Sequence, residues 1–377
     1  MKKKVVFVGL SGGVDSAVSA TLLLKQGFEV VGVFIKTWHP DFLECNEEYE
    51  RRDAMRVAAH LDIPFLTFDL TDVYKREVAD YMINEYKAGR TPNPDVMCNK
   101  EVKFGAFLKR ALAMGADFVA TGHYAIVKTE TSTQFLLEKG IDPTKDQSYF
   151  LWTLNRKQLS KIIFPIGHFK KTEVRKLAKK FVLPVAEKKD SQGICFLGAV
   201  DLKEFLKHYI KSKKGKVLNE RGEIIGHHDG AVFHTLGERH GFTITKKSPN
   251  DSRYYIVRKD IKKNVLYISQ NKNILSEGTH KILQNFCSCS ARQPAQALHK
   301  KHFCLVLENI NWIYCIPKEN KNYTAQIRYH GEFLSCQIKI NSKKKAQVVF
   351  ENPVLVASGQ SVVIYDDDVC LGGGVVA

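Results

Sequence analysis

The sequence predicts an α/β N-terminal domain with a doubly wound parallel sheet, then a small central β-rich domain and a C-terminal β-barrel. Over the first 125 residues, short apolar runs alternate with helical patterns, as in a parallel sheet that is covered on both faces. A lysine-rich stretch at 211–216 ends this pattern. Beyond it, short β-type runs and turns follow one another without helices. We therefore expect domains at 1–210, 211–275 and 276–377.

The elements follow from hydrophobic periodicity and turn residues. In the first domain we predict strands at Lys4–Leu10, Val30–Lys36, Pro64–Leu70 and Asp117–Ala120, and helices at Ser16–Gln26, Glu47–Leu61, Val73–Lys87 and Phe104–Met114. The later β-type runs are Val217–Ile225, Asn264–Gln270, Phe303–Leu307, Thr324–Tyr329, Leu334–Ile340, Ala346–Phe350 and Ser361–Tyr365. Ligands of open parallel sheets bind at the carboxyl ends of the strands, so we look for a site there.

The charge balance is unusual, because 57 Lys and Arg face 40 Asp and Glu, a net charge of +17. Such an excess attracts polyanions, and nucleic acid is the first partner to consider. A solvated lysine-rich surface without a specific partner explains the charge equally well.

The compartment predicted is the cytoplasm. No apolar run is long enough to span a membrane, and the apolar start is too short for a signal peptide. Nine cysteines, an odd number, argue against a secreted disulfide framework. The sequence has no C-x-x-C pair, and Cys287-x-Cys289 has no second pair at ligand spacing, so no metal site is predicted.

A glycine-rich segment, Ser11-Gly12-Gly13-Val14-Asp15-Ser16, connects the first predicted strand and helix. Such a turn brings backbone N–H groups and a helix N-terminus to an anion, and Asp15 acts either through magnesium or as a helix cap. The segment lacks the lysine of a Walker loop and is not G-x-G-x-x-G. It resembles the PP-loop of the ATP pyrophosphatase superfamily, and a tight turn without a ligand is the less favoured alternative. The strand end at 120–123 should reach the same pocket, which makes His123 a candidate by location.

Two further segments carry cysteines. In Asn93-Pro94-Asp95-Val96-Met97-Cys98, the prolines of the loop exclude helix, and Cys98 lies near a helix start and lysines that lower a thiol pKa. Asp95 is close enough to act as a general acid or base. A buried, inert Cys98 is the alternative. The second segment, Asp190–Phe196, places Cys195 after a glycine turn, so a mobile loop is expected to deliver this thiol.

Together with Lys145–Phe150, His234–Gly237 and Cys370–Gly374, these segments resemble the bacterial tRNA-specific 2-thiouridylase family over the whole chain. The resemblance implies an adenine nucleotide alpha hydrolase-like first domain and ATP as cofactor with Mg²⁺. The ATP-binding residues implied are Gly9, Leu10, Ser11, Gly12, Gly13, Val14, Asp15, Ser16, Ile35 and Gly122. The residues implied to contact the wobble uridine or the anticodon loop are Asn93, Pro94, Asp95, His123, Lys145, Asp146, Gln147, Arg328, Tyr329 and Gln360.

Three positions depart from the family pattern. Glu238 and His240 stand where Gln and Lys are usual, which removes positive charge from a turn that could face RNA. Ile35 replaces a usual Met on the wall expected to face adenine.

The resemblance implies 2-thiolation of the wobble uridine of tRNA. The C2 oxygen is adenylated, and sulfur from a persulfide on Cys195 replaces it, with release of AMP and pyrophosphate. Cys98 is the implied nucleophile, and it either frees the sulfur as sulfide or takes it onward, leaving a Cys98–Cys195 disulfide for reduction. Asp95 would shuttle the proton, and a sulfur-donor protein would reload the persulfide. The rivals are a PP-loop ligase or amidase for a small metabolite and a non-catalytic RNA-binding protein.

Overall fold

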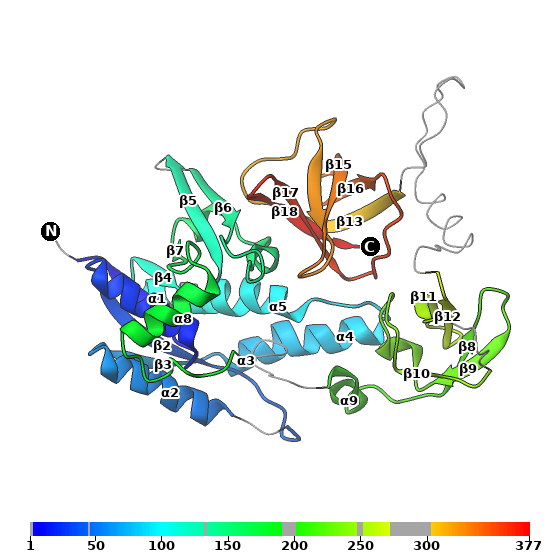
Figure 1. Cartoon of the computed structure of the whole chain (residues 1–377), viewed down its shortest axis with the longest axis horizontal. Coiled ribbons are helices and arrows are strands. Elements are labelled where there is room, and N and C mark those ends of the chain that lie inside the picture. Colours follow the sequence, from blue (N-terminus) through cyan, green and yellow to red (C-terminus); the bar gives the residue numbers. More distant parts are fainter. Residues whose placement is uncertain (1–2, 44–45, 132–133, 191–200, 247–251, 272–302) are drawn as a thin grey trace.

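The computed structural model describes residues 3–43, 46–131, 134–190, 201–246, 252–271 and 303–377. It has a parallel sheet with helices at one end, a small β-domain at the other end and a β-barrel between and above them (Figure 1). The predicted fold class is confirmed. No helix in these ranges is long and apolar enough to cross a membrane.

The first domain is built on a parallel sheet in the order β3-β2-β1-β4-β7. Its strands are β1 (Val5–Gly9), β2 (Glu29–Lys36), β3 (Phe65–Asp69), β4 (Phe118–Ala120) and β7 (Ile162–Ile163). One face is covered by α1 (Val14–Lys25), α2 (Glu47–His60) and α8 (Lys171–Lys180), whose buried residues pack with Val6 and Val8. Phe7, Val33 and Phe68 point into a second core on the other face. The sheet is therefore doubly wound, as predicted.

Two long helical segments cover that second face. The first runs through α3 (Thr71–Tyr74), the π-helical turns η1 (Lys75–Asp80) and α4 (Tyr81–Lys87). The second runs through α5 (Pro94–Met97), the π-helical η2 (Cys98–Phe107) and α6 (Leu108–Ala113). The prediction that the prolines exclude helix before Phe104 is wrong, because Pro94 occupies the first helical position, where its missing N–H costs nothing.

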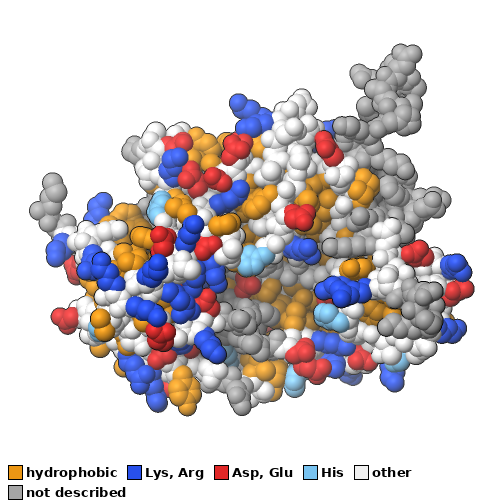
Figure 2. All heavy atoms as spheres, in the orientation of Figure 1, with side chains coloured by type: hydrophobic (Ala, Val, Ile, Leu, Met, Phe, Trp, Pro, Cys, Tyr) orange, Lys and Arg blue, Asp and Glu red, His pale blue; other side chains and the backbone are white. Residues whose placement is uncertain are grey.

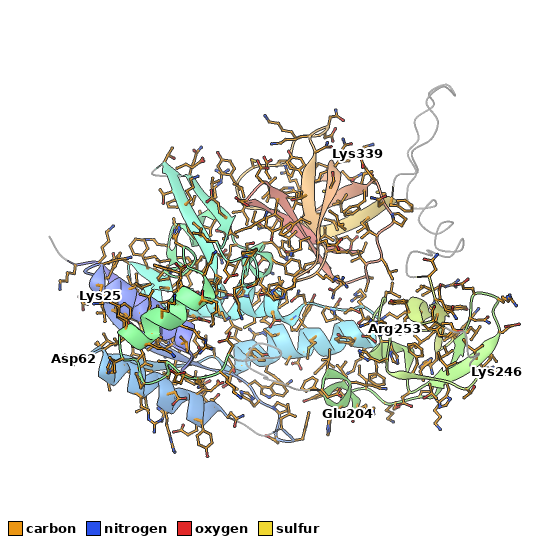
Figure 3. All side chains as sticks on the ribbon, in the orientation of Figure 1. Lys25, Asp62, Glu204, Lys246, Arg253 and Lys339 are labelled. Atoms are coloured by element: carbon orange, nitrogen blue, oxygen red, sulfur yellow. The ribbon has the colours of Figure 1, made fainter. Side chains whose placement is uncertain are left out.

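The central domain is a sheet in the order β10-β9-β8-β12-β11, and it follows α9 (Leu202–Lys207). Its strands are β8 (Gly215–Leu218), β9 (Ile224–His228), β10 (Phe242–Ile244), β11 (Tyr255–Asp260) and β12 (Val265–Ser269), with the short helix η4 (Ala231–Phe233) after β9. Its own small core includes Val217, Ile256 and Leu266. Figure 3 places the labelled Lys246 and Arg253 here, at the opposite end of the molecule from Lys25.

The barrel closes in the order β13-β16-β15-β14-β17-β18, because β13 also pairs with β18. Its strands are β13 (Phe303–Trp312), β14 (Tyr323–Gln326), β15 (Phe333–Ser342), β16 (Lys345–Phe350), β17 (Ser361–Asp366) and β18 (Val369–Val376). The five predicted runs from Phe303 onward match strands, whereas β18 was missed because three glycines interrupt its apolar pattern.

A hairpin of the first domain joins the barrel. It consists of β5 (Ala125–Thr131) and β6 (Gln134–Lys139), and Glu138 of β6 pairs with Val369 of β18. The connection back to β7 contains η3 (Ser148–Leu151) and α7 (Arg156–Leu159). Tyr365 and Cys370 of the barrel belong to the same buried cluster as the helices of the first domain. The barrel is therefore packed directly onto the first domain.

Candidate active site

The glycine-rich segment forms a tight cradle at the carboxyl end of β1. Gly12 has φ +70°, and a Cβ on it would lie 2.5 Å from the Glu50 carbonyl oxygen. Ser16 Oγ donates to the Gly13 carbonyl at 3.1 Å and lies 3.3 Å from the Ser11 backbone nitrogen. Within the described residues, no side chain caps the first turn of α1. Its N–H groups therefore remain able to bind an anion.

The remaining residues of the predicted ATP site line the same edge. Gly122, just after β4, packs so closely that a Cβ would lie 2.7 Å from the Ser16 backbone nitrogen. Leu10 and Val14 are buried beneath the cradle, and Ile35 is buried at the end of β2. The expectation that the end of β4 meets the glycine-rich turn is confirmed by this contact.

Asp15 does not cap α1 but belongs to a charged network. Lys171 Nζ lies 2.8 Å from both Asp15 carboxylate oxygens, and the Tyr124 hydroxyl donates to Oδ1 at 2.8 Å. Lys171 also pairs with Asp190 at 2.9 Å. Two more cations, Lys145 at 3.0 Å and Arg175 at 2.5 Å, converge on Asp190. The network therefore connects the cradle with the residue that precedes 191–200.

The network sets the ionisation of Asp190. Burial raises the pKa of this carboxyl group, but hydrogen bonds from Lys171 and Lys145 outweigh it and lower the pKa to about 2. Asp190 is therefore an anion that keeps three cations gathered at one edge of the sheet. Lys and Arg side chains also crowd the surface over α8 in Figure 2. Such a cluster beside a helix N-terminus suits a polyphosphate.

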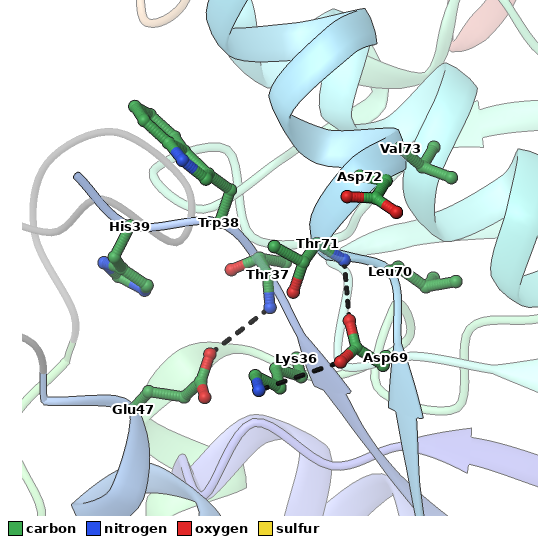
Figure 4. Close-up of a pocket in the computed structure, with 10 residues that line it drawn as sticks. All are labelled: Lys36, Thr37, Trp38, His39, Glu47, Asp69, Leu70, Thr71, Asp72 and Val73. Carbon is green, nitrogen blue, oxygen red and sulfur yellow. Dashed lines mark hydrogen bonds and ion pairs between the residues drawn. The ribbon is translucent and has the colours of Figure 1, made fainter. Parts of the chain in front are cut away.

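A pocket of about 730 Å³ opens at the carboxyl ends of β2 and β3 (Figure 4). Its lining comprises Lys36, Thr37, Trp38, His39, Glu47, Asp69, Leu70, Thr71, Asp72 and Val73. Glu47 accepts a hydrogen bond from the Thr37 backbone at 3.3 Å, and Lys36 pairs with Asp69 at 3.7 Å. Burial lowers the pKa of His39 against the opposing effect of Glu47. Since β2 is the neighbour of β1, this pocket lies on the same sheet edge as the cradle.

The second predicted segment begins the helix on the other face of the sheet. Asn93 caps α5 by accepting from the Val96 backbone at 3.2 Å, and it also hydrogen-bonds the Tyr149 hydroxyl. Asn93, Pro94 and Asp95 are half-buried, whereas Cys98 is completely buried. Cys98 lies near a helix start, as expected, but it follows that start by four residues instead of preceding it, and its thiol is enclosed in this conformation.

The structure gathers several residues predicted to contact tRNA. Tyr329 is half-buried, and its ring lies 4.4 Å from that of Phe150. Burial, together with the charges of Asp146 and Asp95, raises the pKa of Tyr329 to about 12. Those electrostatic effects place the 93–95 and 145–150 segments beside the barrel loop, where Arg328 is exposed. Residues from three distant parts of the sequence therefore share one surface.

Other predicted residues have their polar groups engaged inside the protein. Asp146 is buried and accepts from the Gly140 backbone at 2.9 Å and from Ser148 Oγ at 2.8 Å. Gln147 accepts from the Tyr124 backbone at 3.1 Å, and Gln360 donates to the Thr91 carbonyl at 2.8 Å. These contacts show how the residues are positioned, and tRNA contact by them stays a prediction.

His123 is enclosed between aromatic rings. Its Nδ1 lies 2.6 Å from Thr121 Oγ1, and the rings of Phe104 and Phe164 flank it at 5.7 and 5.6 Å. Burial lowers the pKa of His123 well below its ordinary value, and the charge of Lys103 adds to this. The imidazole is therefore neutral and interior. Cys195, the other predicted sulfur carrier, lies outside the described residues.

Sequence reasoning missed Lys171, Asp190 and Tyr124 as parts of this site. Lys171 is one lysine among many in a basic helix, so nothing local distinguishes it from Lys176 or Lys180. Only the packing of α8 against α1 brings it to Asp15. The only sequence signal was the position of Asp190 at the start of the cysteine segment.

Comparison with family models gives three consecutive matches. Residues 4–199 match the tRNA methyl transferase HUP domain, and residues 203–270 match the tRNA methyl transferase PRC-barrel domain. Residues 302–376 match the Aminomethyltransferase beta-barrel domain. Together the matches follow the observed sequence of parallel sheet, small β-domain and barrel.

Curated relatives match the chain from end to end. The tRNA-specific 2-thiouridylase MnmA of Geobacillus thermodenitrificans is 41% identical over 98% of this chain and 94% of its own length. The protein of the same name from Francisella tularensis subsp. holarctica is 41% identical over 100% of both chains. The chain belongs to the tRNA-specific 2-thiouridylase family. The resemblance predicted from its motifs is thereby confirmed.

Solved structures add little to this 2-thiouridylase assignment. The U34-tRNA thiolase NcsA from Methanococcus maripaludis aligns with 56% of this chain and 67% of its own, at 17% identity and a TM-score of 0.34. A 4-thiouridine synthetase in complex with RNA and ATP aligns with 54% of this chain, at 22% identity and a TM-score of 0.33. Both scores are too low to carry an argument.

Proposed function

We propose that this chain is an ATP-dependent tRNA-uridine 2-sulfurtransferase that thiolates the wobble uridine. The observation that carries the proposal is the full-length 41% identity to tRNA-specific 2-thiouridylases. The intact glycine-rich cradle and the half-buried Asn93–Asp95 segment support it. We propose the same three domains as the sequence predicts, 1–210, 211–275 and 276–377, and a cytoplasmic location.

The residues present fit ATP. The uncapped N-terminus of α1 and the glycines of the cradle leave room and N–H donors for phosphates. In the proposal, Gly9–Ser16 hold the phosphates, and Ile35 and Gly122 border the nucleotide. Lys171 would exchange part of its contact with Asp15 for a phosphate oxygen. Mg²⁺ would be held mainly by the phosphates and water, with Asp15 as the protein carboxylate.

ATP, when bound, supplies an adenylyl group that turns the C2 oxygen of uridine into a leaving group. The protein must then hold the base, deliver sulfur and keep water away. We assign base contact to Asn93 and Pro94, proton transfer to Asp95 and sulfur delivery to a persulfide on Cys195. Cys98 would be the second thiol, forming a transient disulfide with Cys195. Because Cys98 is completely buried here, its helix start must open before its sulfur can react.

The substrate is proposed to be tRNA bound through its anticodon loop. Recognition of a uridine requires an unstacked base, which single-stranded loops offer. The net charge of +17 and the exposed Arg328 favour a polyanion over a small metabolite. We assign tRNA contacts or their orientation to His123, Lys145, Asp146, Gln147, Arg328, Tyr329 and Gln360. A sulfur-donor protein would reload Cys195.

The proposal is tested by incubating the purified chain with unmodified tRNA, ATP, Mg²⁺, a dithiol reductant and a persulfide-loaded sulfur-donor protein, followed by nucleoside mass spectrometry. We expect one 2-thiouridine per tRNA at the wobble position, and pyrophosphate release that depends on tRNA. Pyrophosphate release without tRNA but with an amine donor would favour a metabolite ligase. Binding of tRNA without ATP consumption would favour a non-catalytic RNA-binding protein.

A further inference from the structure

The residue Thr91 is held by all three domains at once. It lies in the first domain, between α4 and α5, and its side chain and backbone are buried. Its Oγ1 is 3.1 Å from Thr235 Oγ1 of the central domain. Its backbone N–H donates to Ser358 of the barrel at 2.8 Å, and its carbonyl accepts from Gln360 Nε2 at 2.8 Å. Every polar group of one residue therefore bonds to another domain.

The barrel side of this contact is shaped to fit. Gly359, between the two bonding residues, has φ +91°, and a Cβ on it would lie 2.9 Å from the Thr91 carbonyl oxygen. The backbone segments at Gly359 and Thr91 therefore approach each other as closely as a glycine allows. Tyr149 adds a second tie nearby, because its hydroxyl donates to the Ser361 carbonyl at 3.0 Å while Asn93 bonds to the same hydroxyl.

The central-domain side is also rigid. Lys259 Nζ donates to the His234 carbonyl at 2.7 Å, and the Gly237 backbone donates to Ile256 at 2.8 Å. The Glu238 carboxylate lies 3.3 Å from His234 Nδ1. Glu238, which departs from the family pattern, therefore interacts with His234 within the same turn. These bonds hold Thr235, within the motif His234–Gly237, in a fixed position. The Tyr86 hydroxyl also hydrogen-bonds to Thr235.

The position of Thr91 is transmitted to the reacting groups. Only Pro92 and Asn93 separate it from the helix that begins at Pro94 and carries Asp95 and Cys98 in its first turns. Proline restricts the connection, since its ring fixes φ and limits the residue before it. Any shift of Thr91 must therefore move the start of that helix.

We propose that Thr91 and Thr235 are positioning residues, whose hydroxyl contact, with Gln360, registers the Asn93–Cys98 segment against the central domain and the barrel. The contact places the proposed base-binding residues in working positions only when all three domains are assembled. A misplacement of about 1 Å can lower a rate about a hundredfold, so a small shift at this junction suffices to matter. The inference rests on the proposed thiolation function and deepens it.

The test compares Thr91→Val, Thr91→Ser, Thr235→Val and the Thr91→Val/Thr235→Val double variant in full-length enzyme. Valine keeps the shape and removes the hydroxyl, whereas serine keeps the hydroxyl. Thr245→Val is a control that loses a hydroxyl bond within one domain, because Thr245 Oγ1 donates to Ile225 at 3.3 Å within the central domain alone. For each variant, kcat and KM are measured for tRNA thiolation, together with ATP affinity and the melting temperature.

We expect each single valine variant to lower kcat about tenfold, with KM for ATP changed less than about twofold. The double variant should be no worse than either single variant, because both remove the same contact. Thr91→Ser should restore most of the rate, and Thr245→Val should behave as wild type. Lower melting temperatures with unchanged kcat, additive losses or no rescue by serine would overturn the proposal. If wild-type enzyme made no thiouridine, the proposed function would fail instead.

Discussion

The two halves of the candidate site are built in opposite ways. The nucleotide cradle comes from one short segment, Ser11–Ser16, whose hydrogen bonds are local and whose backbone glycine fits against α2. The half proposed to bind the base and to supply a thiol comes from Asn93–Cys98, and Thr91, just before it, is held by the central domain and the barrel. The first half can bind its ligand within one domain, whereas the second needs the whole chain.

This difference separates binding from chemistry. Changes in the cradle should weaken ATP binding, while changes in the second half should slow sulfur transfer and leave ATP affinity intact.

The largest effect is expected for Cys98→Ser. A serine oxygen cannot form the proposed disulfide, so thiolation should fall about a hundredfold or more, while ATP binding stays as in wild type. Cys336→Ser is the control, because Cys336 is equally enclosed, in the barrel, and burial raises its pKa to about 12. Thiolation is measured by nucleoside mass spectrometry, and ATP binding by calorimetry. Full activity in Cys98→Ser would refute the two-thiol scheme.

The next largest effect is expected for Gly12→Ala. The added Cβ meets the Glu50 carbonyl in a left-handed conformation, so we expect about 2–4 kcal/mol of strain and a loss of ATP affinity of tenfold or more. Gly27→Ala is the matched control, with φ +86° and open space around the new Cβ, at about 1 kcal/mol. Urea unfolding and ATP titration measure both. Equal losses of unfolding free energy and of ATP affinity in the two variants would show that the close packing of Gly12 in the cradle is not their cause.

A smaller effect is expected for Lys171→Met. The change leaves Asp15 and Asp190 without their shared cation, and KM for ATP should rise about tenfold. Lys176→Met, an exposed position of the same helix, should change it less than about twofold. Initial rates of pyrophosphate release give KM. If Lys171→Met lowered kcat and left KM for ATP unchanged, Lys171 would act in sulfur transfer rather than in ATP binding.

The smallest effect is a pH dependence of stability at Asp190. Its folded pKa of about 2 lies below the ordinary 3.8, so its stabilisation is present above pH 3.8 and is lost as pH falls toward 2. With allowance for solvent screening, Asp190→Asn should cost about 1 kcal/mol at neutral pH and less at about pH 3. Urea midpoints at both pH values measure this. If the difference in unfolding free energy between wild type and Asp190→Asn were as large at about pH 3 as at neutral pH, ionised Asp190 would not be the source of the stabilisation.

The sequence was informative wherever structure is local. The apolar runs around Val5–Gly9 and Glu29–Lys36 identify buried strands, and Ser11–Ser16 identifies the cradle, because each feature depends on neighbours in the chain. The helix at Pro94 was misplaced, since proline was read as a breaker although it is favoured at a first helical position. The predicted helix start at Phe104 therefore lies ten residues after the observed start at Pro94.

Contacts between distant segments were beyond reach. The pairing of Glu138 with Val369 and the bond between Thr91 and Thr235 join residues more than a hundred positions apart. Neither pair has a composition or spacing that distinguishes it from many other threonines or strand residues. Lys171 was hidden in the same way, because its partner Asp15 is fixed only by how α8 packs.

The central claim is that the C2 oxygen of uridine is activated by ATP and then replaced by sulfur. It is tested most directly by giving the enzyme tRNA whose target uridine carries a heavy oxygen isotope at C2, and analysing the products of one turnover. The account predicts that the heavy oxygen is recovered in the phosphate group of AMP. Recovery of the heavy oxygen in pyrophosphate or water, or its retention in the modified base, would contradict it.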